Sequence, residues 1–179
     1  MFSIEDSLLF VIDVQDRLVG MLKNSEEISK NNMILTKAAK ILDVPTFVSE
    51  QYPQGLGSTI LEVRENVHPE NIFEKTSFSV WEQENIKSKL IEYRRKNIIL
   101  TGIETHICVY QSALALMENG YNVYVVKNAC SSRKTKDYKT ALELMRDFGA
   151  KLTCVETVLF KLLKSSNHPN FKEIQDLIK

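Results

Sequence analysis

The sequence predicts an α/β fold, a three-layer α/β/α domain with a mainly parallel sheet, and three observations lead to it. Short apolar runs alternate along the chain with segments whose apolar residues recur every three or four positions. The run at residues 8–12 is continuously apolar, which is typical of a strand buried on both faces. Repeated strand–helix units join parallel strands by right-handed crossovers, which place helices on both faces of the sheet.

Each expected strand is a short run of mainly apolar or β-branched residues. These runs lie at residues 8–12, 45–48, 71–75, 97–102, 123–126 and 152–155. Between the second and third runs, Pro53, Gly55 and Gly57 predict a loop over residues 51–58.

Each expected helix shows apolar residues on one face at helical spacing. These segments lie at residues 28–42, 86–93, 107–119, 138–148, 157–163 and 171–178. Gly120 and Gly149 stand where the third and fourth of them should end, as glycine often does at a helix C-terminus.

The length and net charge of the chain limit the possible domain number and classes of function. A chain of 179 residues suits one domain over residues 1–179. Lys plus Arg and Asp plus Glu both number 23, so the net charge is zero, which argues against a general nucleic-acid binder. The basic runs at 94–96 and 133–134 are short, and we expect them to be solvated surface.

Targeting and redox signals favour a cytoplasmic protein. The longest apolar run is far shorter than the roughly 20 residues that span a bilayer, so we expect no membrane partner. Glu5 and Asp6 stand where a secretory signal would be basic. The cysteines Cys108, Cys130 and Cys154 lack CxxC spacing, which argues against a disulfide framework or zinc knuckle.

Three reactive side chains follow expected strands. Ligands of parallel sheets bind beyond the carboxyl ends of the strands. Asp13 follows the first strand, Lys75 closes the third, and Cys108 lies just past the fourth. The fold would bring all three to one end of the sheet. Asp13 is either this functional group or the cap of a helix that starts near Gln15.

Cys108 is either an activated nucleophile or an inert buried thiol. If Thr105 caps the helix, Cys108 is its third residue, where free N–H groups and the helix dipole favour a thiolate. Such surroundings lower a thiol pKa from about 8.5 to roughly 3.5–7.5. His106 is two residues from Cys108 and does not face it on a helix.

The remaining histidines and cysteines carry weaker signals. We expect His68 and His168 to be solvated, because their neighbours are polar. Cys130 and Cys154 lie at strand ends without an assigned base and are interpreted as inert, although Cys130 could approach the site.

Four stretches of sequence carry a family resemblance: residues 9–15, 73–79, 102–109 and 119–123. With them the chain resembles the cysteine hydrolase superfamily that has the isochorismatase-like hydrolase fold and includes the nicotinamidases. The stretches at 50–57, 128–133 and 168–175 resemble one subgroup of it, and the likeness covers about residues 8–178.

The resemblance implies a role for each site residue. Asp13 would be the general base, Lys75 its cationic partner and Cys108 the nucleophile. A cis peptide bond would join Ile103 to Glu104, and the backbone N–H groups of Glu104 and Cys108 would form the oxyanion hole.

These roles imply a cofactor-free hydrolase that cleaves a small amide or imide through a thioester. Metal-binding nicotinamidases carry an Asp-x-His type of ligand set near the second strand; residues 48–52 contain no histidine, so we expect no metal. The alternatives are an isochorismatase-type vinyl-ether hydrolase with Asp13 as the acid, and a non-enzymatic binding or scaffold protein with a relict site.

Other expectations concern the substrate pocket and assembly. Residues near the motifs are candidates for pocket walls, although core packing is the alternative for the aromatic ones; they are Gln15, Tyr52, Leu56, Phe78 and Trp81. The partner is expected to be a small-molecule substrate, and family members commonly form homo-oligomers.

Overall fold

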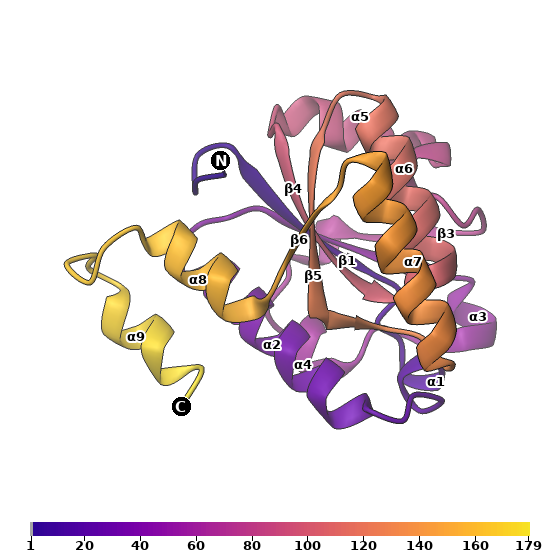
Figure 1. Ribbon diagram of the computed structural model, residues 1–179, viewed down its shortest axis with the longest axis horizontal. Coiled ribbons are helices and arrows are strands. Elements are labelled where there is room, and N and C mark those ends of the chain that lie inside the picture. Colours follow the sequence, from indigo (N-terminus) through magenta and orange to yellow (C-terminus); the bar gives the residue numbers. More distant parts are fainter. Residues whose placement is uncertain (1) are drawn as a thin grey trace.

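The computed structural model describes residues 2–179 and contains a six-stranded parallel sheet with helices on both faces, which confirms the predicted fold class (Figure 1). The strand order is β3-β2-β1-β4-β5-β6. The strands are β1 (Ser7–Ile12), β2 (Thr46–Gln51), β3 (Ile72–Lys75), β4 (Asn97–Ile103), β5 (Asn122–Ser131) and β6 (Lys151–Thr153).

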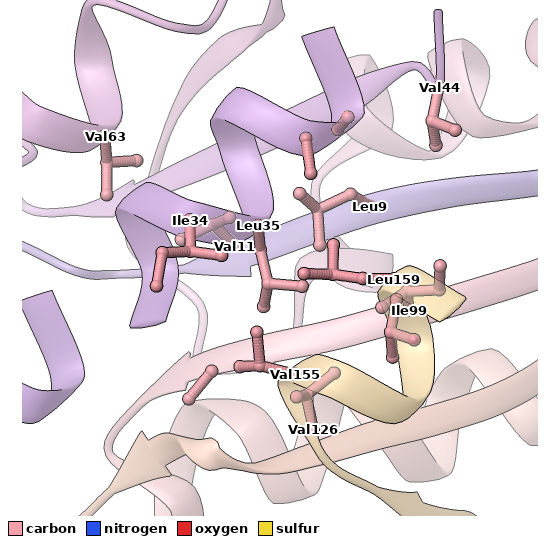
Figure 2. Packing of buried hydrophobic residues seen from close by; sticks show 14 of the residues in the cluster. Leu9, Val11, Ile34, Leu35, Val44, Val63, Ile99, Val126, Val155 and Leu159 are labelled. Atoms are coloured by element: carbon pink, nitrogen blue, oxygen red, sulfur yellow. The ribbon is translucent and has the colours of Figure 1, made fainter. Parts of the chain in front are cut away.

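The two faces of the sheet bury two separate hydrophobic clusters. Because side chains alternate along a strand, Leu9 and Val11 of β1 point to one face, and Leu8, Phe10 and Ile12 point to the other. The first face packs against α2 (Ser25–Ile41) and α8 (Val155–Leu163), whose contacts appear in Figure 2. The opposite face packs against α5 (Glu84–Tyr93), α6 (Tyr110–Glu118) and α7 (Thr135–Phe148).

Short helical segments connect the layers. They are α1 (Asp16–Val19), α3 (Pro53–Leu56), α4 (Leu61–Arg64), the 3₁₀ turns Pro69–Asn71 and Val80–Glu82, the π-helical turn Thr105–Val109, and α9 (Phe171–Asp176). The prediction of a loop over residues 51–58 is therefore wrong for its central residues, which form α3. Pro53 starts α3, because proline suits the first position of a helix even beside glycines.

Strand boundaries also differ from the expectation, most of all at the ends of β2, which runs to Gln51, of β5 and of β6. β6 ends at Thr153, and Val155 already starts α8. β5 runs on to Ser131 and pairs with β4 again beyond an irregularity between Leu100 and Gly102. This longer strand carries Cys130 and Ser131 alongside the end of β4.

Candidate active site

Asp13 lies directly beyond β1 with φ 51°. Its backbone N–H donates to the Ser49 carbonyl at 3.0 Å, and its Oδ1 accepts a hydrogen bond from Ser49 Oγ at 2.7 Å. The side chain is fully buried and caps no helix, because α1 begins at Asp16 after Gln15 and has no side-chain cap. The helix-cap alternative for Asp13 is therefore wrong.

Lys75 reaches Asp13 from the edge strand β3, across β2. Its Nζ lies 2.8 Å from Asp13 Oδ2, and neither side chain of this ion pair is exposed. The ammonium also donates to Gln51 Oε1 at 2.6 Å and to the Ser77 carbonyl at 3.2 Å. All three of its hydrogens thus have acceptors, as a buried ammonium requires.

Gly102 allows β4 to approach β1 just before the cysteine. Its φ is 126°, and a Cβ at this position would lie 2.0 Å from the Ile12 carbonyl oxygen. Only glycine fits there, because it tolerates both the conformation and the close backbone contact. The approach brings the turn that contains Cys108 to the end of β1, beside Asp13.

Cys108 lies beside the ion pair with little exposure. Its exposed fraction is 7%, and its Sγ lies 4.0 Å from Gln51 Oε1. Burial above all, and the Asp13 charge after it, raise the pKa of the thiol to about 12, against the opposing effect of Lys75. The surroundings of Cys108 therefore favour the neutral thiol over the expected thiolate, because burial and the carboxylate outweigh the ammonium.

The predicted cap at Thr105 is also wrong. The helical turn begins at Thr105 itself, after Glu104, and no side chain caps it. Thr105 Oγ1 instead donates to the Ser131 carbonyl at 2.9 Å. Cys108 is therefore the fourth residue of the turn, not the third.

The Asp13 carboxyl is suited to accept a proton. Burial raises its pKa above the usual value, while Lys75 and Ser49 favour the charged form. Both of its oxygens accept hydrogen bonds from these donors, which is the pattern of an ionised carboxylate. A carboxylate with a raised pKa is a stronger base than a solvated one.

The backbone before the cysteine has the geometry that the resemblance implies, with a cis peptide bond between Ile103 and Glu104. The Glu104 carboxylate is held by Arg133, whose backbone N–H and Nε donate to Oε1 at 3.1 and 2.9 Å. The oxyanion role of the Glu104 and Cys108 N–H groups stays a prediction.

Two predicted pocket residues have partners within the protein. Gln15 is fully buried and ties loops together: its Nε2 donates to the carbonyls of Gln51 and Gly57, and its Oε1 accepts from the Gln51 N–H. Trp81 packs edge-on against Tyr121, with ring centroids 5.8 Å apart. It misses the site because the 3₁₀ turn that carries it leads the chain away from the strand ends into α5.

For the other three pocket candidates, the role in a substrate pocket stays a prediction. Tyr52 and Phe78 follow β2 and β3 and are 56% and 52% exposed. Leu56 is half-buried in α3. These side chains belong to the segments next to Asp13 and Lys75.

Sequence reasoning missed Ser49 and Gln51, the two residues of β2 that contact the ion pair. Residues two apart on a strand share a face. Ser49 is paired with Ile12 and Gln51 with Lys75 in the sheet register. The alternation of side chains along β2 therefore places Ser49 and Gln51 next to the ends of β1 and β3. This was the signal in the sequence that could have identified them.

Other polar candidates have their own partners. Glu50 accepts hydrogen bonds from the N–H and Oγ1 of Thr59, both at 2.7 Å. His106 Nδ1 lies 2.9 Å from Ser132 Oγ, and its Nε2 lies 3.9 Å from Asp137 Oδ2. His68 is exposed as predicted, whereas His168 is half-buried and its Nδ1 accepts from the Asn170 N–H.

Residues 2–179 contain neither a metal-binding cluster of side chains nor a membrane-spanning helix. No group of three or more His, Cys, Asp and Glu side chains there is arranged to hold a metal ion. No helix in the same residues is long and apolar enough to cross a membrane.

Comparisons with known proteins agree with the resemblance. The family model of the isochorismatase domain matches residues 7–157. Isochorismatase domain-containing protein 2 of Xenopus laevis is 39% identical over 172 residues, which cover 96% of this chain and 83% of the relative. The secreted isochorismatase effector Isc1 of Phytophthora sojae is 38% identical over 177 residues, covering 97% of this chain and 84% of that protein.

A solved structure agrees over the same length. The MAR1 ribonuclease from Caenorhabditis elegans superposes with a TM-score of 0.93 at 40% identity, covering 99% of this chain and 91% of that one. The subgroup resemblance at 50–57, 128–133 and 168–175 is to isochorismatase domain-containing protein 2, and the Xenopus relative confirms it. By family model, sequence and fold, the chain belongs to the isochorismatase family and has its hydrolase fold.

Proposed function

We propose that the chain is a cofactor-free cysteine hydrolase that cleaves the C–N bond of a small amide or imide through a thioester on Cys108. The observation that carries this proposal is the buried Asp13–Lys75 ion pair, at 2.8 Å, beside the Cys108 sulfur. A fully desolvated ion pair contributes little to stability by itself. Its position next to a thiol gives it a chemical use.

The first step moves a proton as the sulfur attacks. The resting thiol is neutral, because its pKa is raised to about 12. As Sγ bonds to the substrate carbonyl carbon, the thiol proton passes to the Asp13 carboxylate, so a free thiolate need not accumulate. The carbonyl oxygen becomes an oxyanion, which the N–H groups of Glu104 and Cys108 would stabilise; one such donor lowers a barrier by about 2.7–4 kcal/mol.

The second step releases the amine, and water completes the reaction. Asp13 returns the proton to the nitrogen as the C–N bond breaks, which leaves a thioester on Cys108. Asp13 then takes a proton from water, the hydroxide attacks the thioester carbonyl, and the C–S bond breaks. The carboxylic acid leaves and the proton returns to the sulfur. Lys75 holds Asp13 in place throughout.

The name of the Caenorhabditis elegans relative suggests a different substrate for that protein, an RNA. For this chain, zero net charge gives no general electrostatic footprint for a nucleic acid. A thiol beside a carboxylate and an ammonium suits attack on a carbonyl carbon. We therefore propose the amide reaction and include RNA among the test substrates.

The experiment is to mix the protein with a panel of small primary amides and cyclic imides, quench rapidly in acid, and measure intact mass. With at least one compound, we expect the protein to gain the mass of the acyl group. Peptide digestion should map this mass to Cys108, and it should be absent from Cys108→Ala. The Cys130→Ala variant should acquire the same mass. An adduct on another residue, or turnover of RNA with no adduct and no amide product, would overturn the proposal.

A further inference from the structure

A cavity lies at the other end of the sheet from Asp13, Lys75 and Cys108. Its volume is about 380 Å³, and its wall includes Trp81, Ile91, Arg94, Arg95, Lys96 and Tyr121. Lys96 and Tyr121 immediately precede β4 and β5, so the cavity lies at the amino ends of these strands. The catalytic candidates lie beyond the carboxyl ends, which makes the two sites separate.

The wall of this cavity is strongly basic although the chain has no net charge. Three consecutive cations line it, and no acidic residue does. Among residues 2–179, neither Arg94 nor Lys96 takes part in an ion pair, whereas Arg95 donates to the backbone carbonyls of Ile4 and Glu5. Arg94 and Lys96 are exposed, and a cleft lined by charges of one sign attracts anionic ligands.

Two of these cations are placed over the cavity by the backbone. Arg94 ends α5 in the left-handed conformation, with φ 52°, which turns the chain sharply there. Lys96 lies with its Nζ over Gly120, since a Cβ on that glycine would be 3.6 Å from it. Arg94 and Lys96 therefore reach the cavity from the two ends of a short turn, while Arg95 is anchored to the N-terminal segment.

The rest of the wall is aromatic and apolar. Trp81 and Tyr121 pack edge to face, and Lys87 Nζ lies 5.6 Å from the Trp81 ring centroid. Ile91 beside them is 56% exposed, which is unusual for a large apolar side chain without a partner. Flat rings next to free cations are the groups that hold a nucleotide, with the base against the rings and the phosphate on the cations.

We propose that this cavity binds a free nucleoside monophosphate, with its phosphate on Arg94 and Lys96 and its base against Trp81 and Ile91. The volume is near the lower end of the roughly 300–1,000 Å³ typical of ligand sites, which suits one small ligand. The three basic residues of the wall are consecutive and line one small cavity, so a single nucleotide fits better than a nucleic-acid strand.

The chain provides its own reporter for a test, because Trp81 is its only tryptophan. Tryptophan fluorescence is titrated with AMP, and separately with adenosine, inorganic phosphate and a single-stranded RNA hexamer. We expect AMP to change the emission saturably. Arg94→Gln/Lys96→Gln should weaken AMP binding by about tenfold or more, since each lost charge-assisted contact lowers affinity.

The matched control removes two charges at another place. Lys23→Gln/Lys127→Gln neutralises two exposed lysines that line a separate cavity, and it should bind AMP like the wild type. Equal weakening in both double variants would overturn the proposal, as would no saturable change with AMP. Adenosine or phosphate binding as tightly as AMP would reject the nucleotide class, and much tighter binding of the hexamer would assign the cavity to RNA.

Discussion

Cys108 and Cys130 are both buried thiols, yet they have different neighbours. They are 7% and 2% exposed, and burial is the main cause that raises the pKa of each to about 12. Cys108 lies beside a carboxylate and an ammonium that act on it in opposite directions. Both thiols belong to the second hydrophobic cluster, but the polar contact of the Cys130 sulfur is with the Leu100 carbonyl, at 4.0 Å.

The comparison teaches that a raised thiol pKa does not separate a reactive cysteine from an inert one. What separates them here is a base that can take the proton during attack. Cys130 lies within β5, paired with Gly102, and its sulfur contacts the Leu100 carbonyl and none of the three catalytic candidates. If this difference in surroundings is a difference in chemistry, variants of the two thiols and of the ion pair should behave differently.

The largest effect should follow removal of each thiol in turn. Cys108→Ala should lower amide turnover by about 10⁴-fold or more, as loss of a nucleophile does in other hydrolases. Cys130→Ala should retain turnover, because that sulfur contacts no reacting group. Steady-state release of the amine measures both. A Cys108→Ala variant that still cleaves a vinyl ether would instead support the Asp13-driven reaction.

Loss of the base should have the next largest effect. Asp13→Asn keeps the shape but cannot accept the thiol proton, so kcat should fall by about 10²–10⁴-fold. Glu74→Gln, on the exposed face of the same β3 strand as Lys75, is the control and should be unchanged. Equal activity of Asp13→Asn and wild type would show that the carboxylate has no chemical role.

Breaking the ion pair should cost stability. Lys75→Met leaves Asp13 buried without its cation, and loss of one partner of such a pair costs about 3–5 kcal/mol of unfolding free energy. The double variant Asp13→Asn/Lys75→Met should recover part of this loss. Urea denaturation measures both. Removing Lys89 from its half-exposed pair with Glu92 should cost at most about 1 kcal/mol.

Alkaline pH should destabilise the protein through both thiols. Each thiol has a folded pKa near 12, raised from 9.0, so between these values the unfolded chain releases protons that the folded chain keeps. Stability is then complete below pH 9 and falls as pH rises, by about 1.4 kcal/mol per unit for each thiol. Cys108→Ala and Cys130→Ala should each make this decline shallower, as urea denaturation at several pH values would show.

Much of the fold could be predicted because it depends on local pattern. The continuous apolar run of β1 and the glycines after α6 and α7 mark their elements in the sequence itself. Asp13, Lys75 and Cys108 were found from one topological rule, that parallel strands end together. The ion pair at 2.8 Å bears out the proximity of the first two.

The errors concern contacts between distant segments. Thr105 resembles a helix cap, but its hydroxyl donates a hydrogen bond to the Ser131 carbonyl on the neighbouring strand. Trp81 is near Lys75 in sequence but packs on Tyr121. The pKa of Cys108 depends on burial, which no local pattern of residues reveals.

The most direct test of the coupling between Cys108 and the ion pair is its rate of alkylation by iodoacetamide as a function of pH, followed by peptide mass spectrometry. Relative to wild type, Asp13→Asn should lower the apparent pKa of Cys108 and Lys75→Met should raise it, because the two charges act on it in opposite directions. Cys130 should not respond to either change. Identical Cys108 profiles in all three proteins would contradict the account.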